Sequence, residues 1–136
     1  MKPLASIAAG LLLASVASVS LAAGNPISVH VLNTQTGKPS AGVAVKLEHR
    51  ADGQWETIAT GTTSEDGRIS ALYPESETFE SGVYRAVFET GDWYRARGSA
   101  TFFPEITVPF EVADTQQHYH IPLLLSPYAY STYRGS

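Results

Sequence analysis

Hydrophobic and polar residues alternate in short segments along most of the chain. In ISVHVLN, which spans 27–33, the residues at 27, 29 and 31 are all apolar, whereas Ser28, His30 and Leu32 fall on the opposite face. Side chains of a β-strand point to its two faces in turn, so this spacing predicts a strand with one buried face. His30 therefore points away from the apolar side.

Further segments repeat this pattern, and turn-forming clusters such as TGKPSAG, ADGQ and SEDG separate them. Strands are predicted at 43–50, 55–63, 68–74, 82–90, 106–113, 118–126 and 128–134. The one predicted helix is short, covers 91–98, and has Asp92 as its candidate N-terminal cap. Strands at this regular spacing predict an all-β protein, an antiparallel β-sandwich with one short helix.

The first 23 residues have the composition of a secretory signal peptide. Lys2 precedes an almost unbroken apolar run, and small residues follow at Ala22 and Ala23 before Gly24. The run is short for a membrane-spanning helix, and its small-residue end suits a signal peptidase. We expect cleavage after Ala22 or Ala23, which leaves one domain at 24–136.

Composition narrows the classes of partner. The chain has no cysteine, so a packed core or oligomerisation must stabilise the exported domain without disulfides. After cleavage eight basic residues face thirteen acidic ones, and no basic stripe indicates a nucleic-acid partner. No membrane association is expected once the signal peptide is gone.

The histidines are the first candidates for chemistry. His49 ends a strand beside polar residues and is expected to be exposed, whereas His30 lies mid-strand. His118 and His120 are two residues apart and should share a strand face. Such a pair could ligate zinc, or could supply a base and its helper. Metal is the weaker hypothesis because no cysteine or nearby carboxylate has ligand spacing.

Arg68 and the serines complete the candidates. Arg68 follows the Asp-Gly of a tight turn, where a guanidinium could bind a carboxylate or carbonyl-rich ring in bidentate fashion, although an exposed arginine is common there. Ser126, Ser131 and Ser136 lack the G-x-S-x-G elbow of a serine hydrolase. Phosphate loops, EF-hand loops and dinucleotide fingerprints do not occur in the sequence either.

The final segment, HYHIPLLLSPYAYSTYRGS (118–136), resembles the C-terminus of the 5-hydroxyisourate hydrolases, the transthyretin-like enzymes of purine catabolism. Its closing tetrapeptide YRGS is similar to the signature that separates these enzymes from transthyretin. SVHVLNTQTGKPSAGV (28–43) and TSEDGR (63–68) agree, and the resemblance covers 27–136. Ala129 stands where the family usually has glycine.

The resemblance implies a transthyretin-like fold and a metal-free, cofactor-free hydrolysis of 5-hydroxyisourate in urate degradation, giving 5-hydroxy-2-oxo-4-ureido-2,5-dihydro-1H-imidazole-5-carboxylate. It also implies a homotetramer, a dimer of dimers, and with the signal peptide a periplasmic location. The implied catalytic residues are His30, Arg68 and His120. Substrate-binding roles fall on His30 and Arg68 again, and on Tyr133, Ser131 and Ser136.

General chemistry agrees with these roles. An imidazole can accept a proton from water near neutral pH, and an arginine can stabilise the oxyanion that forms. The pattern leaves open whether His30 or His120 is the base.

Two functions of other classes compete with this hypothesis: a non-catalytic carrier of small ligands, and a structural sandwich of the cell envelope. In transthyretin-like tetramers the equivalent strands line a channel where two dimers meet. His30, Arg68, His120 and Tyr133 would make this channel polar and titratable, which favours catalysis over the carrier. A histidine-rich terminal strand argues against a structural module.

Overall fold

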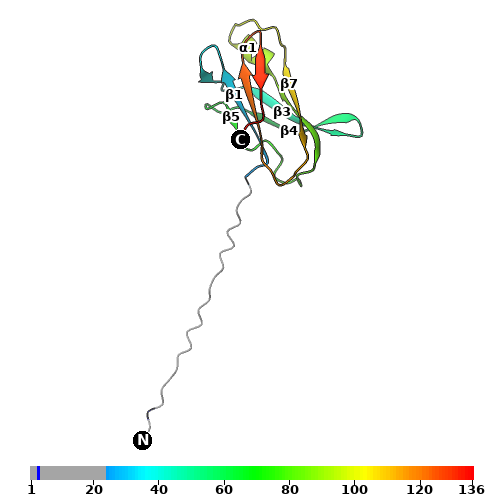
Figure 1. Ribbon diagram of the computed structural model, residues 1–136. Helices are drawn as coiled ribbons and strands as arrows, with labels where there is room; N and C mark the ends of the chain where they lie inside the picture. Colours follow the sequence, from blue (N-terminus) through cyan, green and yellow to red (C-terminus); the bar gives the residue numbers. More distant parts are fainter. Residues whose placement is uncertain (1–2, 4–23) are drawn as a thin grey trace.

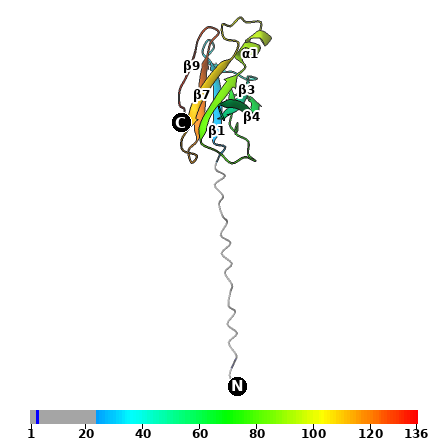
Figure 2. The same ribbon diagram turned by 90° about the vertical axis from the view of Figure 1, so that its right-hand side faces the viewer.

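The computed structural model describes residue 3 and residues 24–136, and this part of the chain forms nine strands and one helix. The strands make two sheets that pack face to face (Figures 1 and 2). This arrangement confirms the predicted all-β sandwich with one short helix. The predicted signal peptide lies outside the described residues.

One sheet has the order β2-β1-β8-β9, with β5 paired to β1 as well. Its strands are β1 (Ile27–Asn33), β2 (Lys38–Pro39), β5 (Arg68–Ile69), β8 (Tyr119–Leu125) and β9 (Tyr130–Thr132). β1 and β8 run parallel, whereas the other pairs of this sheet are antiparallel. The strictly antiparallel sandwich that the sequence predicts therefore has one parallel pair near its centre.

The second sheet has the order β4-β3-β6-β7 and is antiparallel throughout. Its strands are β3 (Ala44–Ala51), β4 (Gln54–Thr62), β6 (Gly82–Phe88) and β7 (Ile106–Val112). A tight turn links β3 to β4, while the helix α1 (Thr90–Ala96) lies in the connection from β6 to β7.

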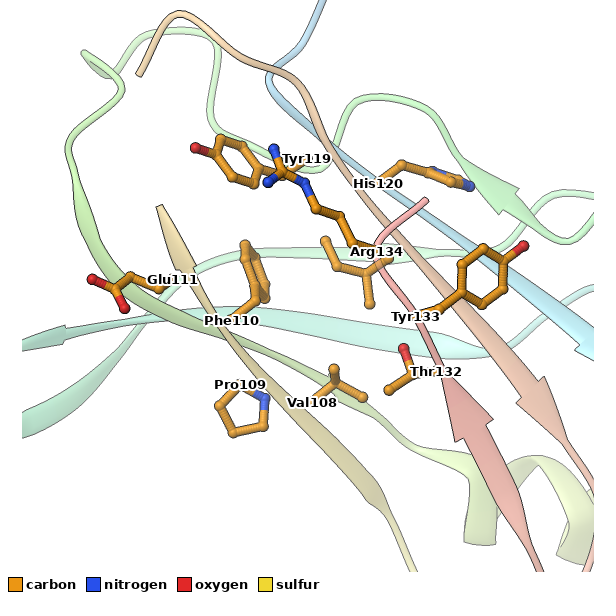
Figure 3. Close-up of a pocket in the computed structure, with 10 residues that line it drawn as sticks. Val108, Pro109, Phe110, Glu111, Tyr119, His120, Thr132, Tyr133 and Arg134 are labelled. Carbon is orange, nitrogen blue, oxygen red and sulfur yellow. The ribbon is translucent and has the colours of Figure 1, made fainter. Parts of the chain in front are cut away.

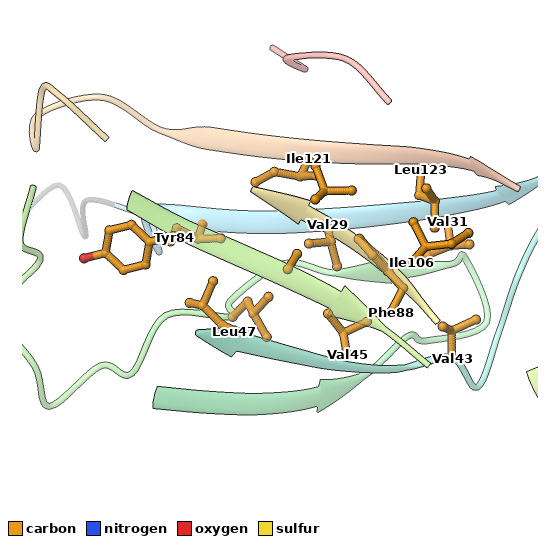
Figure 4. Packing of buried hydrophobic residues seen from close by; sticks show 14 of the residues in the cluster. Val29, Val31, Val43, Val45, Leu47, Tyr84, Phe88, Ile106, Ile121 and Leu123 are labelled. Carbon is orange, nitrogen blue, oxygen red and sulfur yellow. The ribbon is translucent and has the colours of Figure 1, made fainter. Parts of the chain in front are cut away.

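Apolar side chains from both sheets fill the space between them (Figure 4). Val29 and Val31 of β1 are fully buried against residues such as Leu47 and Phe88 of the second sheet. Burying each such side chain contributes about 1.5–3 kcal/mol to folding. This packing fixes β1 in place and turns Ser28 and His30 to the outer face of the first sheet.

The helix differs from its prediction in its N-terminus. It starts at Thr90 with Glu89 as N-cap residue, and no side chain caps it. Asp92 lies inside the first turn, where it pairs with Arg95 at 2.7 Å, so its predicted role as cap is wrong. Tertiary packing holds the helix instead, since Trp93 is buried and its indole donates to the carbonyl of Ala41 at 2.7 Å.

Two predicted strands are shorter in the structure. The segment 68–74 is a strand only over Arg68 and Ile69, after which the Leu72 amide donates one more hydrogen bond to the Ile27 carbonyl at 3.0 Å and the side chains of Leu72 and Tyr73 are buried in the core. The segment 128–134 keeps only Tyr130–Thr132 as a strand. No helix in the described part of the chain is both long and apolar enough to span a membrane.

Candidate active site

His30 and Arg68 are brought together by strand pairing. His30 lies mid-way along β1 and is half-buried, and Arg68 is its direct partner in the antiparallel register of β5. Opposed residues of antiparallel strands project to the same face. The two residues, 38 positions apart in the chain, are therefore neighbours on the outer face of the sheet.

The turn that precedes β5 holds Arg68 in position. Gly67 has a φ of +75°, and its carbonyl accepts a hydrogen bond from the Val31 amide at 2.8 Å. The Asp66 carboxylate accepts from the Ser64 hydroxyl and from the Arg68 amide, and also lies 3.9 Å from the guanidinium. A glycine is required here because a Cβ at Gly67 would lie 2.5 Å from the Val31 carbonyl oxygen.

His120 joins the pair from β8. The parallel register of β1 and β8 sets Ser28 opposite His120 and His30 opposite Pro122, so the two histidines are diagonal neighbours. Their ring centroids lie 6.5 Å apart, with an interplanar angle of 28°. The three residues predicted to be catalytic thus form one cluster.

The C-terminal tetrapeptide borders this cluster. The pairing of β9 with β8 continues in the same register to a bridge between Gly135 and His120, with the Gly135 amide donating to the His120 carbonyl at 2.9 Å. Tyr133 is 59% exposed, and its ring points in the same direction as the His120 ring (Figure 3). The chain end is therefore part of the sheet and not a frayed tail.

Gly135 allows this close approach. A Cβ at position 135 would overlap Cδ2 of the His120 ring and lie 3.1 Å from its Cγ. The imidazole occupies the space that a side chain would take. Sequence reasoning assigned no role to Gly135, although a glycine next to a site strand is a signal of close backbone approach.

Ser28 was also missed as a site residue. Its hydroxyl oxygen lies 2.7 Å from Nδ1 of His120 and 2.8 Å from Nε2 of His118. His118 is exposed and has its Nδ1 2.8 Å from the carbonyl oxygen of Asn25. His118 and His120 thus share a face, as predicted, and meet at a buried serine hydroxyl.

The surroundings favour neutral imidazoles at both candidate bases. Burial lowers the pKa of His30 below its usual value of 6.5, and the positive charge of Arg68 lowers it further, against a smaller opposing effect of Asp66. Burial and then Arg68 also lower the pKa of His120, with His30 and His118 adding to the effect. Both rings are therefore neutral, and able to accept a proton, at neutral pH.

The remaining predicted residues are spread along the same edge. Ser131 pairs with Leu124, further along β8 than His120, and its side chain is exposed. Ser136 follows Gly135 and is exposed as well. His49 was expected to be exposed, which is wrong: it is half-buried and stacks on Tyr84, with ring centroids 4.2 Å apart.

A groove of about 300 Å³ lies beside the C-terminal segment (Figure 3). It is lined by β7 residues, by Thr132 and Arg134, and by two of the candidate site residues, His120 and Tyr133. The Arg134 guanidinium lies 5.1 Å from the centre of the Tyr119 ring. Within the described residues, His, Asp and Glu side chains form no group of three arranged to hold a metal ion.

Known proteins share this sequence and fold. The family model described as HIUase/Transthyretin family matches residues 27–135. A 5-hydroxyisourate hydrolase from Salmonella dublin is 52% identical over 134 residues, covering 98% of this chain and 96% of the relative. One from Pseudomonas aeruginosa is 44% identical over 115 residues, covering 81% and 90%.

Solved structures are similar over the same region. The 5-hydroxyisourate hydrolase of Klebsiella pneumoniae superposes with a TM-score of 0.72 at 34% identity, covering 82% of this chain and 99% of the other. A sea bream transthyretin in complex with thyroxine gives 0.75 at 38%, covering 81% and 94%. The overall fold alone therefore does not separate a hydrolase from a transthyretin, and the residues of the site must do so.

Proposed function

This chain belongs to the HIUase/Transthyretin family and acts as a hydrolase of 5-hydroxyisourate in purine catabolism, and we propose that His30, Arg68 and His120 carry out its reaction. The observation that carries the proposal is their position on one sheet face, where the half-buried imidazole of His30 lies between the strands that carry Arg68 and the half-buried His120. This cluster has the groups that hydrolysis of a cyclic amide requires.

The reaction begins with water. A neutral imidazole of the pair removes a proton as the water oxygen attacks a ring carbonyl of the substrate. The carbonyl oxygen becomes an oxyanion, which the Arg68 guanidinium stabilises with charge-assisted hydrogen bonds. When the tetrahedral intermediate collapses, the carbon–nitrogen bond of the ring breaks, and the imidazolium returns its proton to the leaving nitrogen. The ring opens to a carboxylate.

Arg68 serves this sequence in two ways. It stabilises the developing negative charge, and its own charge keeps the pKa of both histidines low. The exposed side chain of Tyr133, together with Ser131 and Ser136, would supply hydrogen bonds to the polar edge of the substrate. These three residues therefore act as substrate-binding groups in our proposal.

A ligand carrier on the same fold is the alternative function. The sea bream transthyretin structure is a complex with thyroxine. An aromatic ligand without a reactive amide has no use for two neutral imidazoles beside an arginine. The composition of the cluster therefore favours hydrolysis.

We further propose that the protein is a homotetramer built as a dimer of dimers. Leu32 and Leu124 are paired on the outer face of the first sheet, directly beside the histidine cluster, and Tyr133 is largely exposed next to them. Covering this face with a second copy would bury apolar surface and enclose the site in a channel.

Export to the periplasm is the last part of the proposal. It rests on the apolar run and small-residue end of residues 1–23, which together are typical of a cleaved signal peptide. The hydrolase would then act on 5-hydroxyisourate outside the cytoplasm.

The test is the ultraviolet decay of freshly prepared 5-hydroxyisourate, with and without the purified protein. His30→Ala, Arg68→Ala and His120→Ala should each lower kcat by about 10²–10⁴-fold, the usual loss at a general base or oxyanion donor. His49→Ala, which removes a histidine on the other sheet, should keep the wild-type rate. Wild-type rates in the first three variants would place the site elsewhere.

A further inference from the structure

The hydrogen bonds of Ser28 have a direction that the chemistry of their partners determines. A chain of hydrogen bonds runs from the Asn25 carbonyl through the His118 ring and the Ser28 hydroxyl to the His120 ring. The donor–acceptor distance of every link is between 2.7 and 2.8 Å. Ser28 is only 8% exposed, so its two bonds are partly shielded from solvent, whereas the link between His118 and Asn25 is exposed.

The carbonyl oxygen of Asn25 fixes the first link, because it can only accept. Nδ1 of His118 must therefore carry a hydrogen and donate it. In the neutral imidazole the other nitrogen, Nε2, is then an acceptor, so the Ser28 hydroxyl donates its proton to Nε2 of His118.

The last link follows from the first two. A serine hydroxyl has one proton, and here it is given to His118, so the oxygen is left to accept from Nδ1–H of His120. Neutral His120 then carries its lone pair on Nε2. No hydrogen bond within the described residues occupies that nitrogen.

We infer that Ser28 and His118, anchored by the Asn25 carbonyl, are positioning residues that hold His120 in its Nδ1–H tautomer and so make Nε2 of His120 the base of the reaction. The inference rests on the proposed function of His120, and it assigns the proton acceptor that the sequence left open between two histidines. Ser28 and His118 do not touch the reacting atoms and act only through His120.

This chain of hydrogen bonds is also compatible with the protonated form of His120. When Nε2 of His120 takes the proton from water, Nδ1 keeps its hydrogen, so the bond to Ser28 persists and becomes charge-assisted. No hydrogen bond needs to break during the transfer. In serine proteases an aspartate performs the corresponding orientation of a histidine, and the wrong tautomer costs about 10⁴-fold in kcat.

Ser28→Ala tests the inference directly. We expect kcat to fall about 10–100-fold with little change in KM, because the base is disoriented while the substrate contacts remain. Ser40→Ala is the matched control: Ser40 is 1% exposed, and its hydroxyl has no hydrogen-bond partner among the described residues. This control should keep the wild-type kcat.

Two substitutions of the exposed His118 test its hydrogen bond to Ser28 and its hydrogen bond to Asn25 separately, without changing the core. In His118→Gln the side-chain carbonyl can take the place of Nε2 and accept from Ser28, whereas in His118→Asn the shorter amide reaches only the Asn25 side. Glutamine should retain most of the wild-type kcat, and asparagine should reproduce the loss of Ser28→Ala. These variants keep the test available even where Ser28→Ala folds poorly.

The ¹⁵N spectrum of His120 gives a readout that does not depend on activity. In the wild type we expect a pyrrole-type Nδ1 and a pyridine-type Nε2, and in Ser28→Ala and His118→Asn a mixture of both tautomers. If the His120 tautomer is unchanged in Ser28→Ala, the inference is overturned whether or not kcat falls. It is also overturned if Nε2 of His120 is pyrrole-type in the wild-type protein.

His120→Ala, assayed in parallel, distinguishes the two ways of failing. Full activity in that variant would remove the proposed function of His120. Low activity in His120→Ala together with wild-type kcat in Ser28→Ala would remove only the positioning chain.

Discussion

At the scale of single residues, one guanidinium influences both candidate bases. Arg68 lowers the pKa of His30 and that of His120, in each case second only to burial. A base with a lowered pKa stays neutral until the pH falls through that value, so the acid limb of the activity profile should lie below pH 6.5. Activity should thus be lost as the pH falls through these lowered pKa values.

The first prediction is that Arg68→Met raises the pKa of both histidines, although burial keeps them below the value of an exposed imidazole. The acid limb of the residual activity should move to higher pH. A titration of the histidine ring protons by NMR measures both shifts. Arg134→Met is the control, because this guanidinium lies against Tyr119 instead. Unchanged histidine titrations in Arg68→Met would contradict the electrostatic argument.

Gly135 gives the second prediction. A methyl group at this position would overlap the His120 ring, so Gly135→Ala must displace either the ring or the chain end. We expect a loss of kcat of about tenfold or more, approaching that of His120→Ala, with the fold retained. Gly24→Ala, where a Cβ would meet nothing within 4 Å, is the matched control. Circular dichroism and decay kinetics measure both; a wild-type rate in Gly135→Ala would show that the ring tolerates displacement.

At the scale of elements, alternation predicted where strands occur but not how they pair. Val29 and Val31 marked the buried face of β1 correctly, because period-two burial is local information. The parallel neighbour of β1 is β8, about 90 residues later, and nothing in either strand encodes that direction. The predicted strand at 68–74 is too long for a related reason: Leu72 and Tyr73 are apolar because they enter the core and not because they continue a strand.

The same distinction applies to the site. His30, Arg68 and His120 were found as residue types that suit hydrolysis, and a family resemblance supported them. Ser28 could not be found in this way, because its importance comes from the parallel register that places it opposite His120. A serine on the polar side of a strand is ordinary until its partners are known.

The third prediction concerns the C-terminal segment as an element. Deleting residues 133–136 removes the bridge to His120 but leaves β8 paired with β1 along its whole length. The core should therefore stay buried, and the thermal midpoint should change little. Activity should fall by about 10² or more, because His120 loses its neighbour and the site opens to bulk water. Tyr133→Phe, which loses only a hydroxyl group, should be milder. Full activity of the truncated protein would show that the segment is not part of the site.

At the scale of the whole molecule, the fourth prediction is export with cleavage. Expression of the full chain in a Gram-negative host should place the protein in the periplasm, with Ala23 or Gly24 as its first residue. Mass spectrometry of the periplasmic fraction determines the terminus. Replacing two leucines of the apolar run, Leu11 and Leu12, by arginine should retain the protein in the cytoplasm. Intact chain in the membrane fraction would contradict cleavage.

Assembly is the fifth prediction, and it follows from the surface that surrounds the site. The outer face of the first sheet carries the paired leucines Leu32 and Leu124 next to half-buried histidines, so a second copy placed there would cover apolar and catalytic groups together. We expect a tetramer in sedimentation experiments at micromolar concentration. Leu124→Arg introduces a charge into this face and should give a smaller species with lower kcat/KM, because the channel would no longer close around the substrate.

Thr60→Arg is the matched control for this substitution. Thr60 is exposed on β4, in the other sheet, so the same added charge should leave both the tetramer and its activity unchanged. The comparison links assembly to catalysis only if size and activity change together. A Leu124→Arg protein that sediments as a smaller species and yet retains full activity would show that each subunit holds a complete site. The sheet face, the turn before Arg68 and the C-terminal segment of one subunit would then be sufficient for the reaction.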